Sequence, residues 1–455
     1  MHYRPEVGML QAFAWATLVG CFVGTLILVT DKGYRYGTAA AWFIVTMAVP
    51  SWLAITFRSI HLDPTMMVGI AVILMGLFRP FNGSRFRWSP IDISVLSILV
   101  MCVVSDALNR LLIPGTVIQL TRVWLIPYLM GRIFAASYDS PRRLMPLIAA
   151  LGMGLSMYAL VEAFTKINVV AKMTGMVWPL LETSEGFRWG IKRAQGNTNH
   201  PIYFGMLMVM LLPWLLWVAR HRLHSWWAAL PWVGGAAGFV SVSRSAQISL
   251  LIVLMADQFF RRPVLRLPIL VLAIIGGIMF MSFRQEVLDS LGRYAGEQDP
   301  SADKVVIYGE TYDYTGTRHR DLLELAYAEG IEQAEWVGFG TNMIDMPKDP
   351  YLDKRFVSID NDYLIHYLSY GYLGVGSLLV FELITSLYLI RLAFNRRDPR
   401  SDLAAGLCGS FIAVILVLRG VTWSSDFSDM WLFVAGLTAG WTTTTPSSAL
   451  IVEQE

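Results

Sequence analysis

The sequence has little charge for its length. Only 15% of its 455 residues are charged, whereas 55% are hydrophobic, and soluble domains carry about 25% charged residues. The net charge of +2 and the lack of a basic tail give no indication of nucleic-acid binding. Apolar runs of about 20 residues recur along the chain, and each can cross a hydrocarbon core about 30 Å thick as a helix. This composition excludes a soluble multidomain protein and predicts an all-α polytopic membrane protein.

Cysteine is also scarce. Cys21, Cys102 and Cys408 all lie in apolar runs, so no disulfide framework is expected and the three side chains are interpreted as small buried hydrophobes. The sequence contains no metal-ligand spacing of Cys, His, Asp or Glu and no GxxxxGK[ST] phosphate-binding loop. It therefore predicts no bound metal, no cofactor and no ATP hydrolysis.

About 13 apolar runs qualify as membrane spans, and 12 is an alternative because Pro64–Phe78 and Ala246–Phe260 are short. The first run is interpreted as a retained span, because it is long for a signal peptide and lacks a clear cleavage site. The predicted spans are Gly8–Val29, Thr38–Phe57, Pro64–Phe78, Ile91–Ile113, Val117–Ala135, Leu144–Phe164, Ile202–Ala219, Trp226–Val242, Ala246–Phe260, Val264–Phe283, Tyr363–Ile390, Leu403–Leu418 and Met430–Thr442.

Short basic loops predict the orientation, because such loops stay in the cytoplasm. Counting the spans places five basic loops on one side of the membrane. The side on which the N-terminus lies depends on whether the chain has 12 or 13 spans. These loops contain Arg79, Arg85 and Arg87; Arg132, Arg142 and Arg143; Arg220 and Arg222; Arg261, Arg262 and Arg266; and Arg391, Arg396, Arg397 and Arg400. The stretches Lys166–Pro201, Arg284–Asp362 and Arg419–Asp429 then face the opposite side of the membrane.

The longest interruption of the apolar pattern is Arg284–Asp362. Its 79 residues carry 17 Asp and Glu against 8 Lys and Arg, which is half of the 34 acidic residues in the chain. A connection of this length is usually functional or disordered, and its tightly spaced arginines favour a functional part. The chain is accordingly divided into N-terminal helices (1–165), a polar stretch on the non-cytoplasmic side with the central helices (166–283), a large loop on that same side (284–362), and C-terminal helices with a short cytoplasmic tail (363–455).

Two polar motifs border spans on the non-cytoplasmic side. RAQGNTNHP begins at Arg193 and leads into a span, with Gln195, Asn197, Asn199 and His200 as hydrogen-bonding side chains. A helix N-terminus beside an arginine favours an anion; an ordinary capped turn is the alternative. SVSRSAQ places Ser243 and Arg244 in so short a connection that the arginine lies near the hydrocarbon level, where a cation either serves function or snorkels to the interface.

The long loop contains a third motif, YTGTRHRDLLELAYAEG, which predicts a short helix ending at Gly330. Arg318 and Arg320 fall in its first turn, where cations oppose the helix dipole and are interpreted as ligands of an external anion. A solvated pair that partners nearby acids is the alternative. Its apolar side is predicted to consist of Leu322, Leu323, Ala326 and Ala328.

The fourth motif, DNDYLIHYLSYGYLGVG, opens the next span with Asp360, Asn361 and Asp362. These side chains are either helix caps or, for one carboxylate, the partner of a sugar hydroxyl. His366 is interpreted as a satisfied packing residue. The glycines that follow are predicted to permit close helix packing; they are Gly371, Gly374 and Gly376.

In their order, the four motifs resemble the O-antigen ligase and O-antigen polymerase family of bacterial envelope glycosyltransferases. The resemblance covers Arg193 to about Leu379 and includes an Asn361 followed, after nine residues, by Gly371-Tyr372-Leu373-Gly374. Ligases would carry histidine at the position of Asp360, so the aspartate looks more like the polymerase branch, which includes exopolysaccharide and capsule polymerases.

The resemblance implies a GT-C-like, multi-pass protein of the bacterial inner membrane that uses neither metal nor nucleotide sugar. It places the non-cytoplasmic stretches, including the large loop, in the periplasm. It implies a glycan donor on undecaprenyl pyrophosphate, a glycan acceptor and a chain-length regulator as a partner. Asp360 would orient or deprotonate the attacking hydroxyl, and Arg244 with Arg320 or Arg318 would stabilise the pyrophosphate. The implied substrate-binding residues are Arg193, Asn197, Asn199, His200, Ser243 and Asn361. The alternatives are a ligase that joins the glycan to lipid A-core or protein, and a lipid-linked oligosaccharide flippase.

Overall fold

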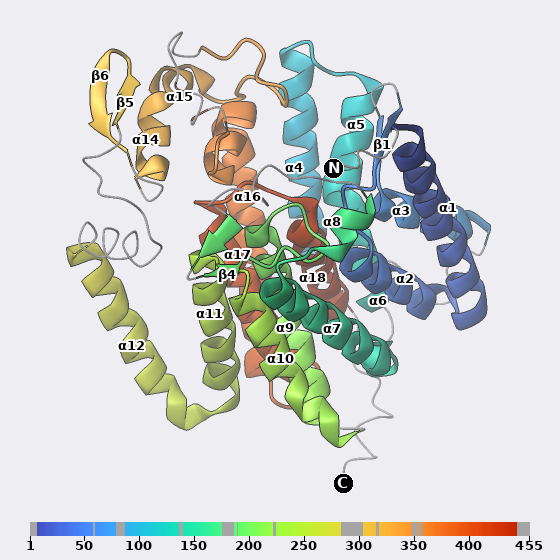
Figure 1. Cartoon of the computed structure of the whole chain (residues 1–455). Coiled ribbons are helices and arrows are strands. Elements are labelled where there is room, and N and C mark those ends of the chain that lie inside the picture. Colours follow the sequence, from blue (N-terminus) through green and yellow to red (C-terminus); the bar gives the residue numbers. More distant parts are fainter. Residues whose placement is uncertain are drawn as a thin grey trace.

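The computed structural model describes residues 7–57, 60–78, 87–135, 140–174, 186–188, 190–221, 224–283, 304–314, 318–347, 353, 356 and 358–443. It is mostly helical, and six of its helices are long and apolar enough to cross a membrane: Gln11–Lys32, Pro90–Leu108, Pro141–Thr165, Pro201–His221, Asp362–Phe394 and Ser401–Leu418. A multi-pass membrane protein is the architecture that these helices indicate (Figure 1).

The first half of the chain contains α1 (Val7–Lys32), α2 (Tyr34–Ala48), β1 (Ile55–Phe57), β2 (Ile60–Leu62), α3 (Pro64–Phe78), α4 (Pro90–Leu108), α5 (Pro114–Leu120), the π-helix η1 (Thr121–Leu125), α6 (Ile126–Ala135), α7 (Ser140–Thr165), α8 (Val169–Thr174), β3 (Phe187–Arg188), β4 (Ile191–Lys192) and α9 (Pro201–His221). The remainder contains the 3-10 helix η4 (Ser225–Ala229), α10 (Leu230–Phe239), α11 (Arg244–Arg261), α12 (Pro263–Ser282), β5 (Lys304–Ile307), β6 (Glu310–Asp313), α14 (His319–Ala326), α15 (Ala328–Ala334), α16 (Asp362–Phe394), α17 (Ser401–Leu418) and α18 (Ser425–Thr443).

Several predicted spans differ from the observed helices. The predicted span Thr38–Phe57 is wrong, because α2 ends at Ala48 and residues Ile55–Phe57 pair with β2 in an antiparallel hairpin. The run Val117–Ala135 is divided among α5, η1 and α6. The described residues also contain three two-stranded hairpins, β1–β2, β3–β4 and β5–β6, which the all-α prediction did not include. All three lie outside the long helices.

The centre of the bundle is an especially close contact between α6 and α18. A Cβ atom at Gly131 would lie 1.9 Å from the carbonyl oxygen of Phe433, and one at Gly436 would lie 1.9 Å from that of Tyr128. Only glycine permits the two backbones to approach so closely, as small residues do at other helix contacts in membranes. Around this contact the aromatic side chains of Trp42, Trp214 and Phe433 are fully buried.

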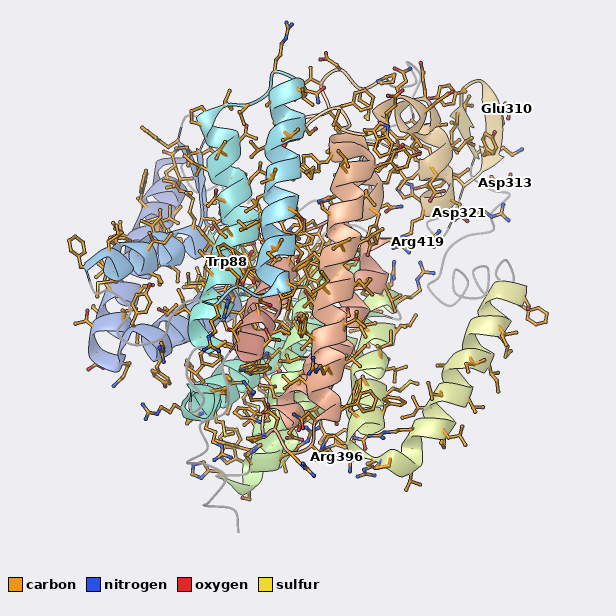
Figure 2. All side chains as sticks on the ribbon, turned by 180° about the vertical axis from the view of Figure 1, so that it is seen from behind. Trp88, Glu310, Asp313, Asp321, Arg396 and Arg419 are labelled. Carbon is orange, nitrogen blue, oxygen red and sulfur yellow. The ribbon has the colours of Figure 1, made fainter. Side chains whose placement is uncertain are left out.

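The basic loops meet at one end of the bundle. Arg132 donates to the hydroxyl of Thr443 at 2.9 Å, and Arg400 donates to the carbonyl of Trp441 at 3.0 Å, both at the end of α18. Arg220 and Arg261 share the carboxylate of Asp402. Figure 2 shows Arg396 at the opposite end of the molecule from Glu310 and Asp313. This gathering agrees with the common side that the sequence predicts for the basic loops; Arg79, Arg85 and Arg222 lie outside the described residues.

The described part of the long loop has a small core of its own beside the N-terminal part of α16. Strands β5 and β6 form a hairpin, and α14 and α15 pack next to it (Figure 1). The predicted end of the helix at Gly330 is wrong: the helix breaks at Tyr327, and Gly330 lies inside α15. The apolar members of this core include Val305, Ile307, Leu323, Ala326 and Phe356.

Candidate functional site

Glu162, fully buried in α7, holds the stretch that carries Arg193. Its Oε2 accepts hydrogen bonds from the backbone N–H of Gln195 at 3.2 Å and of Gly196 at 2.8 Å. Its other oxygen lies 3.7 Å from the Lys192 ammonium group. Because these groups are buried, they fix the turn after β4 and with it the position of Arg193, whose side chain is only 6% exposed.

Arg193 and Arg188 hold the turn that precedes α11. Arg193 Nε donates to the Ser241 carbonyl, and Arg188 Nη1 donates to the Val242 carbonyl, both at 3.3 Å. Val242 has a φ of 47°, so the chain reverses sharply there. Ser243 is the N-cap residue of α11 and Arg244 its first residue. The turn thus brings Arg188 and Arg193, from the stretch before α9, close to the N-terminus of the helix that begins with Arg244.

The polar side chains after Arg193 anchor the beginning of α9. Asn197 donates to the Met47 carbonyl at 3.1 Å, and the Asn199 side chain donates to the Ser51 hydroxyl at 2.9 Å. The Asn199 backbone N–H donates to Asp426 in α18 at 3.0 Å. These contacts connect the motif to the end of α2 and the start of α18, so both asparagines position the site from within the protein.

His200 confirms the predicted helix start, because its Nδ1 accepts the backbone N–H of Ile202 at 3.1 Å. This bond requires Nδ1 to be unprotonated. Burial, together with the smaller effect of the charges of Arg193 and Arg188, lowers the pKa of His200 to about 4. The imidazole is therefore neutral at physiological pH, and the positive charge of this corner comes from its arginines.

The structure separates the two arginines of the long loop. The Arg320 side chain packs on Gly420, where an added Cβ would lie 2.6 Å from Nε, in the connection between α17 and α18. Arg318 instead lies 3.9 Å from Asp313 at the end of β6. Arg320 thus contacts the membrane-spanning bundle, whereas Arg318 contacts the loop's own hairpin.

Asp360 contacts the same connection as Arg320. Its Oδ1 accepts the Thr422 hydroxyl at 3.4 Å and the Ser358 hydroxyl at 3.1 Å, and its side chain is half-buried. Asn361 caps α16 by accepting the Leu364 N–H at 3.2 Å, which confirms the cap interpretation for that residue.

The segment after α15 docks into a break in α16. Gly371 has φ 64° and ψ −161° inside the helix, and the N–H groups of Phe339 and Gly340 donate to the freed carbonyls of Leu368 and Ser369, each at 2.8 Å. Asp106 in α4 accepts the Thr341 N–H at 2.7 Å and its hydroxyl at 2.8 Å. The glycines were predicted to permit close helix packing; Gly371 instead permits a close approach of the non-helical backbone at Trp336 and Val337, and Gly376 faces open space.

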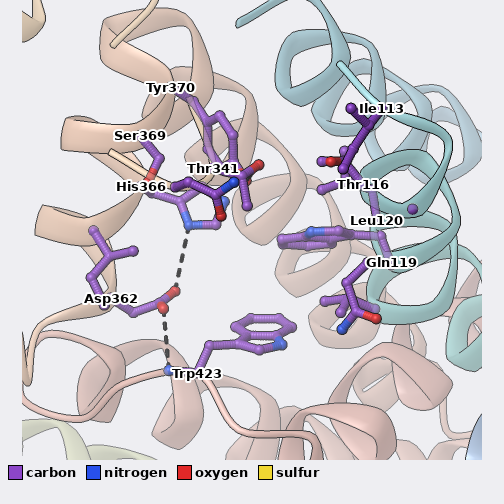
Figure 3. Close-up of a pocket in the computed structure, with 15 residues that line it drawn as sticks. Ile113, Thr116, Gln119, Leu120, Thr341, Asp362, His366, Ser369, Tyr370 and Trp423 are labelled. Carbon is purple, nitrogen blue, oxygen red and sulfur yellow. Dashed lines mark hydrogen bonds and ion pairs between the residues drawn. The ribbon is translucent and has the colours of Figure 1, made fainter. Parts of the chain in front are cut away.

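A cavity of about 380 Å³ lies between this docked segment, α16 and the α5–η1 turn (Figure 3). On one wall Asp362 Oδ1 accepts the Trp423 N–H at 3.2 Å, and Asp362 Oδ2 lies 3.7 Å from His366 Nδ1. The lining residues are Ile113, Gly115, Thr116, Gln119, Leu120, Val123, Trp124, Thr341, Asn342, Asp362, Ile365, His366, Ser369, Tyr370 and Trp423.

His366 corrects an expectation from the sequence. It was expected to be a satisfied packing residue, but its buried Nε2 has no hydrogen-bond partner within the described chain. The reason is that the segment around Thr341 and the turn of α5 stand back from this face of α16 and leave the cavity. Periodicity placed His366 in an apolar span without showing which neighbour faces it.

Several further charged residues support the site or the bundle and were missed by the motif analysis. Besides Arg188, these are Glu162, Asp106 and Asp426, each an acid that holds a loop through hydrogen bonds. Arg122 in η1 is buried between Asp63, at 2.6 Å, and Asp429, at 3.6 Å. An isolated charge in an apolar run is the signal that would have pointed to Glu162, Asp106 and Arg122; Arg188 and Asp426 lie in polar stretches and carry no such signal.

In comparisons with known proteins, no protein-family model matches the chain, and no curated protein matches it significantly. Within the described residues, no group of three or more His, Cys, Asp or Glu side chains is arranged to hold a metal ion. The function is therefore argued from the geometry of the site.

Proposed function

We propose that this chain is a glycosyltransferase of the bacterial inner membrane, with a GT-C-like architecture, that extends a surface polysaccharide at the periplasmic face. The donor is a glycan on undecaprenyl pyrophosphate and the acceptor is another glycan. The observation that carries the proposal is the convergence of arginines on one end of the bundle. Arg193 holds the turn that begins α11, and Arg320 and Asp360 contact the connection between α17 and α18.

This arrangement suits a pyrophosphate leaving group. A guanidinium group binds phosphate oxygens through two parallel hydrogen bonds and stays charged at every physiological pH. Arg244 stands at the N-terminus of α11, where the helix dipole also favours an anion. Partial burial strengthens these interactions relative to water, so they can stabilise charge that develops in the transition state. We assign Arg193, Arg244 and Arg320 to this role, with Ser243 beside them.

In the proposed reaction, the acceptor hydroxyl oxygen forms a bond to the anomeric carbon of the donor. The bond between that carbon and the pyrophosphate oxygen breaks, and its electron pair leaves with the lipid pyrophosphate. Asp360 orients the hydroxyl and receives its proton, which then passes to solvent. The half-buried position of Asp360 leaves it accessible to a substrate, and general-base contributions of this kind amount to about 10²–10⁴ in rate.

One observation favours the flippase alternative. Arg122, Asp63 and Asp429 form a charged group buried among the helices, as a transport pathway would require. Other buried acids have a different role, since Asp106 and Glu162 bind backbone N–H groups of the outer segments. This use of intramembrane charge to anchor a site favours the enzyme. A ligase would use the same reaction with a different acceptor, and the chain-length regulator remains a partner of the proposed polymerase.

The test is glycan extension by purified protein in proteoliposomes supplied with a polyprenyl-pyrophosphate oligosaccharide. Arg244→Ala and Asp360→Asn are each expected to lower turnover by about 100-fold or more, and Asp360→Asn is expected to keep its donor affinity. The matched controls are Arg143→Ala, an exposed arginine at the opposite end, and Asp345→Asn, an exposed acid of the long loop. Normal turnover in either site variant at normal protein level would remove that residue from the mechanism.

A further inference from the structure

We propose that the cavity beside α16 is the acceptor subsite, where a neutral sugar ring binds to Asp362 and His366. The proposal rests on the function proposed above and adds where the acceptor lies and which residues recognise it. It starts from two buried atoms, on side chains that line the cavity, that have no hydrogen-bond partner in the described part of the chain: His366 Nε2, and Asp362 Oδ2, which lies 3.7 Å from His366 Nδ1. Figure 3 shows both side chains on the same wall.

Unsatisfied polar atoms are uncommon in buried positions, because each loses its hydrogen bonds to water without replacement. A sugar hydroxyl is both a donor and an acceptor, so one ring can satisfy a carboxylate oxygen and an imidazole nitrogen together. An apolar lipid chain in the same space would leave both atoms unsatisfied. The polar wall thus distinguishes a polyol from a hydrocarbon.

Aromatic rings provide the opposite kind of contact. Trp124 and Trp423 lie with their ring centroids 4.9 Å apart, and Trp124 meets the His366 ring edge to face at 5.7 Å. The apolar faces of such rings are suited to the C–H face of a sugar, while the amide side chains of Gln119 and Asn342 add hydrogen-bonding groups. A concave, mostly apolar pocket of about 300–1,000 Å³ with a few polar groups is the usual form of a small-ligand site.

The charge of the residues that line the cavity distinguishes it from the site proposed for the donor's pyrophosphate. None of the described residues that line it is a lysine or an arginine, and Asp362 contributes a carboxyl group. A pyrophosphate is therefore disfavoured here and favoured at the arginines. Asp360 lies two residues before Asp362, and both contact the 422–423 connection, through Thr422 and Trp423 respectively. The acceptor ring thus lies next to the residue that orients its hydroxyl.

The wall of the cavity is built by a distorted helix. α5 is continued by the π-helix η1, which contributes Val123 and Trp124 to the lining. π-Helical turns inside helices occur frequently at functional sites. The opposite wall depends on Thr341, which Asp106 holds in place. The cavity is therefore formed by segments that the fold fixes on both sides.

The experiment measures acceptor and donor affinity separately, in protein purified in a detergent without a sugar headgroup. The acceptor probe is an oligosaccharide of the cell's own polysaccharide without lipid pyrophosphate, and binding is followed by tryptophan fluorescence. His366→Asn and Asp362→Asn are expected to raise the acceptor KM about 10-fold or more, with the donor KM within about twofold of wild type. Thr116→Phe fills the cavity from the opposite wall without touching the polar pair and is expected to do the same. His61→Asn, an exposed histidine, is the control.

The outcomes separate the two proposals. If wild-type protein transfers glycan but the three cavity variants keep a normal acceptor KM at a normal melting temperature, the acceptor subsite is wrong and the proposed function stands. If no transfer occurs but the oligosaccharide still binds to wild type and not to the Thr116→Phe variant, the cavity is a sugar site and the proposed reaction is wrong. If no oligosaccharide binds to the wild-type protein, the cavity holds water only and the inference is wrong.

Discussion

Gly371 provides a quantitative test of how the long loop is held on the bundle. Its φ of 64° and ψ of −161° fall in a region that essentially only glycine occupies. A Cβ atom there would lie 2.3 Å from the carbonyl carbon of Trp336 and 2.4 Å from the backbone nitrogen of Val337. Both neighbours are backbone atoms, so neither can move aside by changing a rotamer.

The expected cost of Gly371→Ala is the sum of two effects. The backbone conformation contributes about 1–3 kcal/mol for a residue with a side chain, and the collision with the docked segment contributes about 1–3 kcal/mol as overpacking. Their sum of about 2–6 kcal/mol is a large part of the typical 5–15 kcal/mol stability of a protein. Because the collision involves only the 336–337 backbone, the easiest relaxation is release of the docked segment from α16.

The assay combines thermal unfolding in detergent with limited proteolysis between Glu335 and Thr341. Gly371→Ala is expected to expose this segment to protease and to lower the melting temperature. The control is Gly376→Ala in the same helix, whose added Cβ meets no atom within 4 Å and gains up to about 1 kcal/mol of helix propensity. If both variants show the same protection and the same melting temperature, the docking of the loop at Gly371 is wrong.

Two further predictions concern the Arg193 region. Glu162→Gln removes the carboxylate that accepts the N–H groups of Gln195 and Gly196. We expect it to lower the free energy of unfolding by about 1.5–3 kcal/mol and to raise the donor KM. An unchanged donor KM would show that this acid does not position Arg193. The pKa of His200 is lowered to about 4 in the folded protein, from an ordinary value of 6.5. Between these two pH values the unfolded state therefore binds more protons than the folded state, and the free energy of unfolding decreases as the pH falls from 6.5 to about 4. The expected loss is about 2 kcal/mol at pH 5; His200→Asn, which keeps a capping side chain, is expected to remove this loss, and an equal pH dependence in the variant would contradict the assignment.

The broad architecture could be predicted because hydrophobic run length and loop charge directly reflect the bilayer. Long apolar helices such as Pro201–His221 and Asp362–Phe394 follow from this argument, as does the common end of the basic loops. The predicted spans are wrong where an apolar run does not fold as one continuous helix. Residues Ile55–Phe57 form a strand, because apolar composition alone does not distinguish a short hairpin from the end of a span.

The candidate site could be predicted only in part. Arg193, Arg244 and Asp360 were found because each stands at the border of a span, where a charge is informative. Arg188 and Glu162 were missed because their importance arises from contacts between segments distant in sequence, such as the 3.3 Å bond from Arg188 to Val242. The cavity could not be predicted either, since the lack of a partner for His366 Nε2 among the described residues becomes visible only when the facing helices are placed.

The chemical fate of the lipid-linked donor distinguishes the proposed glycosyltransferase from a transporter most directly. Proteoliposomes containing wild-type protein, a polyprenyl-pyrophosphate oligosaccharide and a glycan acceptor should release one polyprenyl pyrophosphate for each unit added to the acceptor, as measured by mass spectrometry of the lipid and glycan fractions. Movement of the intact lipid-linked oligosaccharide across the bilayer, without cleavage of its anomeric bond, would contradict the account.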